Sequence, residues 1–446
     1  MDKFRIKLPE NVDKIITTLQ EHGYEAYAVG GCVRDSILGR VPGDWDITTS
    51  AMPEETKALF AKTFDTGIEH GTITVLLDGE GYEVTTYRID GEYEDGRHPK
   101  EVTFTRSLEE DLLRRDFTIN AMAYNYKDGL VDIFGGIDDI ERKIIRCVGD
   151  AHARFSEDAL RIMRGIRFAA QLGFEIEEKT RTGMKELAST LTKISAERIQ
   201  VELIKTLVSQ RPTLIREAYV LGITEQFLPE FDLIMGTKQE NIHHMHSVGE
   251  HTLSALENVR ADKVLRLTML FHDMGKPVTK TIDETGVAHF YGHANESEKI
   301  AKKILRRLKF DNDTLNKVCT LVFYHDYCMQ AKDKNVRRAM NKIGEELFPY
   351  YIEVRRADIM AQSEYCRAEK LYNLDEIQRI YEEIVRTGQC VSLKTLAVSG
   401  RDLIQSGMKP GKEIGVKLQE FLEIVLENPE MNTKEKLLNY LGGETK

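Results

Sequence analysis

The sequence predicts an α+β fold, with a mixed sheet in an N-terminal head and helices in all the later domains. Runs rich in β-forming residues occur early in the chain, at 24–29, 71–77 and 82–88. After residue 140 the apolar residues recur at helical spacing, as in 155–172 and 196–208. These patterns predict a domain boundary near residue 140, and with the motifs described below we expect four domains, at 1–140, 141–235, 236–345 and 346–446.

Length and composition are ordinary for a soluble globular protein. The 446 residues suffice for about three domains of usual size, and 41% are hydrophobic and 30% charged. No apolar run approaches the length of a membrane span. The N-terminus, Met1 to Phe4, lacks the basic and then apolar pattern of a secretion signal. We therefore expect a cytoplasmic protein with no membrane partner.

Cysteine spacing and net charge limit the function classes. The six cysteines include no CxxC pair, so the sequence indicates neither a zinc knot nor a disulfide framework. The net charge of −11 argues against a nucleic-acid partner, because affinity for a phosphate backbone rests on Lys and Arg. Net charge is an average, however, and a local basic stripe remains compatible with RNA binding.

The head is predicted to begin with an amphipathic helix at 8–21, ahead of the strand at 24–29. A further helix is expected at 53–64. The strands at 71–77 and 82–88 flank Asp78-Gly79-Glu80-Gly81, which indicates a β-hairpin. The polar, glycine-bearing segment at 91–99 is expected to be mobile.

A glycine pair separates the first strand from a helix predicted at 33–38. Backbone N–H groups of Gly30 and Gly31 at such a turn suit an anion, and Arg34 adds a planar cation. Asp44 and Asp46 follow, and on an extended strand their side chains leave the same face. Paired carboxylates suit Mg²⁺, which also binds nucleotide phosphates, so the whole pattern predicts a nucleotidyl transfer site. Glycines that merely permit a turn, beside solvated aspartates, are the alternative.

Two later segments carry paired charges. The segment at 111–121 is predicted to start a helix that carries Arg114, Arg115 and Asp116, with a surface ion-pair cluster as the alternative. Asp158 and Arg161, at i and i+3, are expected on one helix face. Together they would match the edges of cytosine and adenine and leave buried polar groups unpaired with uracil or guanine. An ordinary intrahelical ion pair is the alternative.

Histidines crowd one part of the chain. Eight of the twelve lie between residues 243 and 325, namely His243, His244, His246, His251, His272, His289, His293 and His325. Imidazoles with a carboxylate suit divalent transition metals, and aspartate follows directly after both His272 and His325. A lone buried histidine is more often structural, but this crowding favours a metal site.

With these motifs assembled, the chain closely resembles the class II nucleotidyltransferases of the polymerase β superfamily, specifically bacterial tRNA CCA-adding enzymes. Five segments look like that family's motifs, in order: 30–46, 114–121, 132–139, 157–161 and 194–198. The resemblance implies a polymerase-β-like head with Mg²⁺ at the catalytic Asp44 and Asp46, and stepwise transfer of CMP and AMP from CTP and ATP to tRNA. It implies these nucleotide-binding residues: Gly30, Gly31, Arg34, Arg115, Asp116, Asn120, Asp158, Arg161, Arg164 and Arg167.

The region after residue 236 resembles an HD phosphohydrolase domain followed by a tRNA-binding tail. The resemblance implies a divalent transition metal, phosphatase or cyclic phosphodiesterase activity on RNA ends, and a phosphate contact at Lys276. It implies these metal ligands: His251, His272, Asp273 and Asp326, with His293 and His325 for a second metal or the substrate phosphate. A purely structural HD fold is the alternative.

The tail contains a Pro-Gly sequence before a predicted helix, where free N–H groups suit phosphate. By resemblance, Lys409, Gly411 and Lys412 grip the tRNA elbow, whereas charged helix faces are usually just solvated. Rival functions are a bacterial poly(A) polymerase, a CC-only or A-only adding enzyme, a UMP transferase acting on a signalling protein, and a non-catalytic RNA scaffold. No protein partner is implied.

Overall fold

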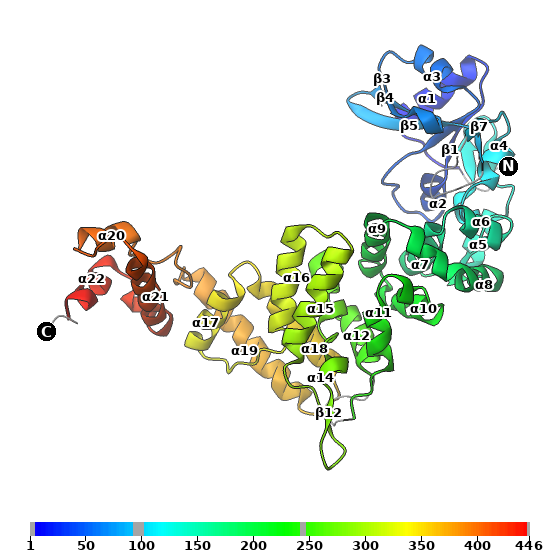
Figure 1. Ribbon diagram of the computed structural model, residues 1–446. Coiled ribbons are helices and arrows are strands. Elements are labelled where there is room, and N and C mark those ends of the chain that lie inside the picture. The colour runs from blue at the N-terminus through cyan, green and yellow to red at the C-terminus, as the bar shows by residue number, and fades with distance from the viewer. Residues whose placement is uncertain (1–4, 92–101, 241–246, 444–446) are drawn as a thin grey trace. The chain divides into compact units, whose positions relative to one another are not determined.

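The computed structural model describes residues 5–91, 102–240 and 247–443 of a chain that divides into two compact units. The first unit spans Met1–Pro229 and the second spans Glu230–Lys446. In Figure 1 the first unit runs from blue to green and the second from green to red. Each unit has its own hydrophobic core. The four predicted domains divide the chain more finely than these two units and stay a prediction.

A seven-stranded mixed sheet forms the centre of the head, with the strand order β3-β4-β5-β2-β1-β8-β9. Strands β2 and β5 pair in parallel, and the other neighbours pair antiparallel. The strands are β1 Ala26–Val29, β2 Ile47–Thr49, β3 Thr63–Gly67, β4 Thr72–Leu77, β5 Glu80–Thr86, β8 Ala123–Asn125 and β9 Gly129–Val131, with a separate pair β6 Arg88–Asp90 and β7 Val102–Phe104. This sheet, with the helical remainder of the chain, confirms the predicted fold class.

Short helices surround this sheet (Figure 1). The head contains α1 Glu10–Glu21, α2 Gly31–Ile37, α3 Pro53–Leu59, α4 Leu108–Leu113 and α5 Gly136–Arg142, with 3-10 turns at Ile68–His70 and Thr118–Asn120. Helix α1 buries Val12, Ile15, Ile16 and Leu19, which lie on one stripe of a helix with 3.6 residues per turn. The apolar residues whose spacing predicted this helix are therefore the ones that it buries.

The predicted hairpin is confirmed, but the predicted helix at 53–64 is wrong at its end. Asp78 and Gly79 link β4 to β5 with φ values of 50° and 87°, which suits a two-residue hairpin turn. Helix α3 stops at Leu59, and Phe64 lies in β3. Pairing of β3 with β4 overrides the helical pattern there. Most of the segment at 91–99 lies outside the described residues.

The rest of the first unit is mainly helical. It contains α6 Ala151–Glu157, α7 Leu160–Leu172, α8 Glu178–Leu187, α9 Ala196–Leu207 and α10 Ile215–Val220, with a two-stranded pair β10 Ile144–Ile145 and β11 Glu175–Ile176. Helix α11 Pro229–Gly236 starts at the last residue of this unit and otherwise belongs to the second unit. The predicted continuous helix at 155–172 is wrong, because Asp158 is extended at φ −139° and ψ 103°. Its carboxylate accepts a bond from Leu160 N at 3.0 Å and so satisfies a free N–H group at the start of α7.

The second unit is helical, as predicted, except for one small hairpin. Its helices are α12 Val248–Glu257, α13 Lys263–Phe271, α14 Lys276–Thr279, α15 His293–Arg307, α16 Asn312–Tyr324, α17 Asp333–Ile343, α18 Phe348–Ala361, α19 Arg367–Arg386, α20 Gly400–Gln405, α21 Lys412–Glu427 and α22 Lys434–Gly443. The hairpin of β12 Thr281–Ile282 and β13 Ala288–His289 projects at the lower edge of Figure 1.

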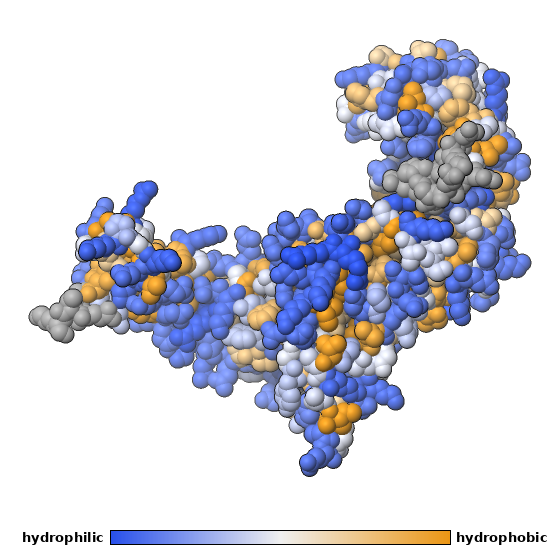
Figure 2. Space-filling view, in the orientation of Figure 1, coloured by the Kyte–Doolittle hydropathy of each residue, from blue (hydrophilic) through white to orange (hydrophobic). Residues whose placement is uncertain are grey.

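The core of the second unit joins its C-terminal helices to the middle ones. Phe348, Tyr351, Leu403 and Phe421 are buried together in one hydrophobic cluster. Most of the surface that Figure 2 shows is hydrophilic. Within the described ranges, every helix is too short or too polar to cross a bilayer.

Candidate functional site

The glycine turn lies between β1 and α2 in the first unit. Gly30 has φ +83°, a conformation that favours glycine, and its N–H donates to Met122 O at 3.1 Å. A Cβ atom at Gly30 would lie 3.0 Å from Arg115 Nη1, so a larger residue would press on this guanidinium. At Gly31 the nearest atom to an added Cβ would be Arg34 Nη2, at 3.7 Å. The turn therefore brings the backbone of both glycines close to two arginines.

Arginines gather around one phenylalanine of α7. The guanidinium carbons of Arg34, Arg164 and Arg167 lie 5.1, 5.4 and 4.1 Å from the centre of the Phe168 ring. Such cation–π contacts hold the guanidinium groups close together despite their like charges. We call Arg34, Arg115, Arg164 and Arg167 the arginine cluster. It supplies a dense positive charge beside the glycine turn.

Asp116 ties this cluster to the second motif. Its carboxylate accepts bonds from Arg164 Nε at 2.7 Å and Asn120 Nδ2 at 3.0 Å, and Arg34 Nη1 donates to Asn120 Oδ1 at 2.5 Å. Burial alone would raise the pKa of Asp116, but Arg164 and Asn120 outweigh it and lower that pKa to about 2. The structure thus brings Arg34, Asp116, Asn120 and Arg164 together.

The second motif does not start a helix, contrary to the sequence prediction. Helix α4 ends at Leu113, and Phe117 is extended because Thr118 N donates to Arg146 O and Val148 N to Asp116 O. Buried Asp111 accepts bonds from Arg114 Nε at 3.0 Å and Arg115 Nη2 at 3.4 Å. Although burial opposes ionisation, these two arginines lower the pKa of Asp111.

Asp44 and Asp46 immediately precede β2, and both side chains are exposed. Val29 N donates to Asp46 O at 3.0 Å, which holds this segment beside the end of β1. Glu83 on β5 is a third carboxylate, which the sequence reading missed. Loss of hydration, and then the charges of Asp46 and Asp44, raises the pKa of Glu83 although it keeps exposed surface.

The electrostatics of these three carboxylates fit a divalent cation. Loss of hydration and the charge of Asp44 raise the pKa of Asp46, and Arg115 only partly opposes this. The charged form of Asp46 is therefore destabilised by Asp44, and that of Glu83 by both aspartates. Carboxylate oxygens that remain open to solvent suit Mg²⁺, which binds through one or two carboxylates together with water and phosphate oxygens.

The predicted pair of Asp158 and Arg161 is not on one helix face. Asp158 lies between α6 and α7, and Arg198 Nη2 of α9 is 2.6 Å from its Oδ2. Arg161 instead pairs with Glu157 and donates to Arg114 O at 3.0 Å. Hence neither the shared helix face nor the alternative intrahelical ion pair of Asp158 with Arg161 is formed, because the chain extends at Asp158.

Five residues of the second unit form a buried histidine cluster: His251, His272, Asp273, His293 and His325. The first three can hold an ion, as can the last three, with ligand atoms in each group within 4.8 Å of one another. Asp273 belongs to both groups. Each of His272, His293 and His325 uses Nδ1 to contact a backbone carbonyl, at 2.7, 2.9 and 2.6 Å. This leaves each Nε2 atom facing Asp273 or a neighbouring imidazole.

The histidine cluster fits a metal centre. Asp273 Oδ2 is buried and, among the described residues, accepts no hydrogen bond of good geometry, although Lys276 Nζ is 2.7 Å away. Burial disfavours the charge on Asp273, yet His272 and Lys276 hold the pKa of Asp273 well below its usual range. A buried ionised carboxylate with an open lone pair, surrounded by imidazoles, suits a divalent transition metal.

The predicted ligand Asp326 lies outside both groups. Its side chain is 58% exposed, and Arg355 Nη1 is 3.8 Å from its Oδ1. Asp358 of α18 reaches the cluster instead, with its Oδ1 3.0 Å from His251 Nε2. The sequence reading chose Asp326 because it follows His325, but that position comes after the end of α16, where the side chain turns toward solvent. Asp358 has no neighbouring histidine in sequence that would have marked it.

Comparison with known proteins gives matches along the whole chain. A family described as the poly A polymerase head domain matches residues 26–146, and one described as tRNA nucleotidyltransferase domain 2 matches 280–441. A third, an RNA- and SrmB-binding site of polymerase A, matches 173–235. A CCA-adding enzyme of Pediococcus pentosaceus is 36% identical over 431 residues, which is 96% of each chain. This chain belongs to the CCA-adding enzyme family.

Other members of the family agree with this assignment. A Lactobacillus helveticus CCA-adding enzyme is 35% identical over 98% of each chain. The Bacillus stearothermophilus CCA-adding enzyme, solved in complex with CTP, matches with a TM-score of 0.71 and 31% identity over 98% of each chain. The Thermotoga maritima enzyme, solved with tRNA, shares the fold with a TM-score of 0.59 at 21% identity, over 98% of this chain and 95% of that one. The predicted resemblance is confirmed, and the protein is a nucleotidyltransferase.

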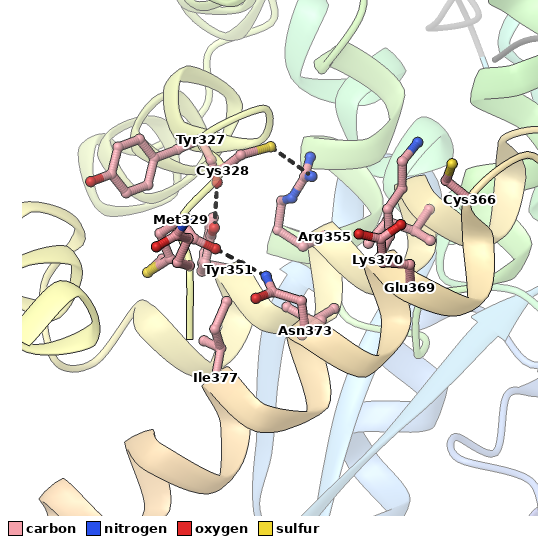
Figure 3. A pocket seen from close by; sticks show the side chains of 13 residues that line it. Tyr327, Cys328, Met329, Tyr351, Arg355, Cys366, Glu369, Lys370, Asn373 and Ile377 are labelled. Carbon is pink, nitrogen blue, oxygen red and sulfur yellow. Dashed lines mark hydrogen bonds between the residues drawn. The ribbon is translucent and has the colours of Figure 1, made fainter. Parts of the chain in front are cut away.

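One cavity lies against the histidine cluster, and Arg355 links it to a second cavity. The first, of about 300 Å³, is lined by Asp273, Lys276, His293 and Asp358, and Asp326 stands at its wall. The other, of about 530 Å³, is mainly apolar and is drawn in Figure 3. Arg355 contacts both walls, because it donates through Nη2 to Cys328 Sγ at 3.3 Å and through Nη1 to Asp358 Oδ2 at 3.2 Å.

The predicted RNA-binding residues lie at the start of α21. Lys409, Gly411 and Lys412 are exposed, and Gly411 offers no side-chain cap to the first N–H groups of this 16-residue helix. These groups are therefore available to an anion from solvent.

Proposed function

We propose that this protein adds CMP and then AMP to the 3′ end of tRNA by two-metal nucleotidyl transfer. The observation that supports this most directly is that Asp44 and Asp46 lie just before β2, which pairs with β5 beside Glu83, while the glycine turn and the arginine cluster lie at the end of the neighbouring β1. A triphosphate needs such an arrangement, with cations on one side and metal-binding carboxylates on the other. We also propose that the chain has the four predicted domains, with the catalytic head at 1–140.

The protein's own residues bind and orient the nucleotide. The N–H groups at Gly30 and Gly31 and the guanidinium groups of Arg34 and Arg115 hold the triphosphate, and Asp116 and Asn120 address the ribose. Asp44, Asp46 and Glu83 would hold Mg²⁺, which would supply activation of the attacking 3′-hydroxyl and stabilisation of the leaving pyrophosphate. Because the arginines are fixed by buried partners, they need little reorganisation during the reaction.

Base choice is assigned to Asp158, in the extended link between α6 and α7, and to Arg161, in the first turn of α7. The carboxylate accepts from an exocyclic amine of cytosine or adenine, and the guanidinium donates to the adjacent ring nitrogen. Arg198, which holds Asp158 at 2.6 Å, sets the direction of that carboxylate. Uracil and guanine present the opposite donor and acceptor order and leave both groups unpaired. Arg167 is held by Glu202 at 2.8 Å and completes the positive wall.

The test is incubation of the purified protein with tRNA lacking its 3′ end and each labelled nucleoside triphosphate. We expect CMP and AMP incorporation, and a fall on the order of 1000-fold or more in Asp46→Asn, since metal ligands contribute several kcal/mol to such transition states. Asp65→Asn, an exposed aspartate of the head, is the matched control. A-tracts, UMP transfer to protein or unchanged activity in Asp46→Asn would contradict the proposal.

Lys409, Gly411 and Lys412 are proposed to bind phosphates of the tRNA. Binding that neutralises phosphates weakens as salt is added. We therefore expect Lys409→Ala with Lys412→Ala to lower tRNA affinity and to reduce its salt dependence, without changing the KM for CTP. A tRNA affinity that does not depend on salt would contradict this assignment.

A second activity, phosphoester hydrolysis, is proposed for the histidine cluster. The supporting observation is the buried Asp273 carboxylate shared by two sets of imidazole ligands. In the reaction, a water oxygen bonds to phosphorus, the ester P–O bond breaks, and the leaving alcohol oxygen takes up a proton. Lys276, which lines the cavity, lies where it would contact the phosphate.

Metal analysis tests this second activity with a sharp pair of variants. After chelation and reloading with Mn²⁺, Ni²⁺ or Zn²⁺, the full-length protein should retain metal, and Asp358→Asn should lose most of it. Asp326→Asn should retain it, because the Asp326 side chain is 58% exposed, whereas Asp358 Oδ1 lies 3.0 Å from His251 Nε2. A wild-type protein without bound transition metal and without phosphoesterase activity would favour a structural role for the cluster.

A further inference from the structure

An exposed tyrosine stands at the mouth of the smaller cavity. Tyr291 lines this cavity together with Asp273 and His293, yet it is 79% exposed. It lies in the short connection between β13 and α15, just before the ligand His293. A large aromatic ring that is both solvent-exposed and next to a cluster of metal-binding groups has no role in packing the core.

The ring of Tyr291 is held in place on one face. It stacks on the His289 imidazole with the ring centres 5.3 Å apart and the planes 5° from parallel. His289 Nε2 in turn lies 2.7 Å from Asp283 Oδ2, so the imidazole is fixed by the hairpin. Thr285 and His289 hold the pKa of Asp283 well below its usual range, which keeps this anchor ionised. Tyr291 remains 79% exposed despite this stacking.

We propose that Tyr291 is a stacking platform for the base of a nucleoside phosphoester whose phosphate lies at the histidine cluster. This proposal rests on the second activity proposed above. Every nucleobase has a π-face, so a positioned aromatic ring binds bases with little regard to sequence. The cavity itself is polar around the ligands, whereas the platform lies at its rim, which matches a substrate with a charged end and a flat aromatic end.

The exposed apolar side chains of α14 and the hairpin do not extend this platform into a protein-docking groove. Val278 and Ile282 are exposed nearby in sequence, but neither lines the cavity. Phe290 lines the cavity and has Lys276 Nζ 5.4 Å from its ring centre, so the wall beside the platform carries positive charge. A cation next to an exposed ring favours a nucleotide over an apolar peptide.

The first test compares a nucleotide with a phosphoester that has no base. The metal-loaded, full-length protein is assayed with uridine 3′-monophosphate and with glycerol 2-phosphate. For Tyr291→Ala, we expect kcat/KM on the nucleotide to fall about 5- to 100-fold, mostly through KM, since one stacked base contributes about 1–3 kcal/mol. Glycerol 2-phosphate should be hydrolysed at an unchanged rate, and Tyr291→Phe should retain nucleotide activity. Tyr372→Ala, a change at another exposed tyrosine, is the control.

A second readout does not depend on turnover. Irradiation with 4-thiouridine 3′-monophosphate should cross-link the peptide that contains Tyr291, and competing uridine 3′-monophosphate should suppress the cross-link. If the wild-type protein hydrolyses neither phosphoester but cross-links at Tyr291, the hydrolytic function is wrong and the platform stands. Equal losses on both substrates in Tyr291→Ala, no loss on either, or no cross-link at this peptide would overturn the platform.

Discussion

Asp116 illustrates how one side chain serves both the stability of the head and its chemistry. It is only 7% exposed, and it stays ionised because Arg164 and Asn120 surround it. The same contacts hold the arginine cluster in position. A buried charge of this kind is tolerated only while its partners remain.

We predict that Asp116→Asn lowers the free energy of unfolding of the protein at neutral pH. The pKa of Asp116 falls from 3.8 to about 2 on folding, which corresponds to on the order of 2 kcal/mol. Because the folded-state pKa is the lower one, this stabilisation is complete above about pH 4 and is lost as the pH falls toward 2. Urea titrations between pH 3 and pH 7 should show the difference between wild type and variant shrinking as the pH falls. A difference that grows in acid would contradict the prediction.

Arg198 acts on base choice through Asp158. We predict that Arg198→Ala, which frees the Asp158 carboxylate, raises UMP misincorporation by roughly tenfold with little change in kcat for CMP, since selectivity rests on a directed acceptor. Arg198→Lys should give a smaller effect, because an ammonium lacks the planar fork. Single-nucleotide incorporation with each NTP measures it, and equal slowing for all four nucleotides would point to a structural role.

At the scale of elements, helix ends place most of the important groups. His272 and His325 lie at the C-terminal ends of α13 and α16, and His293 begins α15. Gly275 allows α14 and α15 to approach, because a Cβ atom there would lie 2.3 Å from His293 O and 2.6 Å from Ser297 N. These are backbone atoms, which cannot move aside as a flexible side chain would.

We therefore predict that Gly275→Ala displaces α15 and lowers metal retention by the histidine cluster at least tenfold. Gly415→Ala is the control, since an added Cβ there meets no atom within 4 Å. Equilibrium metal binding by the two full-length variants provides the measurement. Unchanged metal affinity in Gly275→Ala would show that the helices tolerate the extra atom.

The sequence predicts elements well where local periodicity and packing agree. Helix α1 and the β4–β5 hairpin follow their patterns because the turn residues and the apolar stripe act locally. Asp158 breaks its helix because of an interaction with Arg198, forty residues away, which no local pattern contains. Glu83 and Asp358 were missed for the same reason, since only strand pairing and helix packing bring them to their sites.

At the scale of the whole molecule, two sets of chemical groups are built into two separate units. The carboxylates and the arginine cluster are contained in the first unit, and the histidine cluster in the second. The net charge of −11 gave no hint of the arginine cluster, because acidic surface residues outnumber it. The order of the five motifs along the chain predicted the family better than the composition did.

This separation predicts independent loss of the two activities. His272→Ala should abolish phosphoester hydrolysis and leave CMP incorporation within about twofold of wild type, while Asp46→Asn should do the reverse, since sites without shared partners behave additively. Both assays on the same full-length preparations check this. Loss of both activities in either variant would mean that the two sites depend on each other.

Asp273 belongs to both ligand groups of the histidine cluster, so a substitution at Asp273 and a substitution at a histidine affect metal binding differently. Changing His251 or His293 removes a ligand from one group of three and leaves the other group complete, so the complete group can still hold one ion. Changing Asp273 removes a ligand from both groups at once. A protein lineage that no longer needed metal here could therefore lose metal binding stepwise, by substitutions at the histidines. A single substitution at Asp273 would remove it in one step.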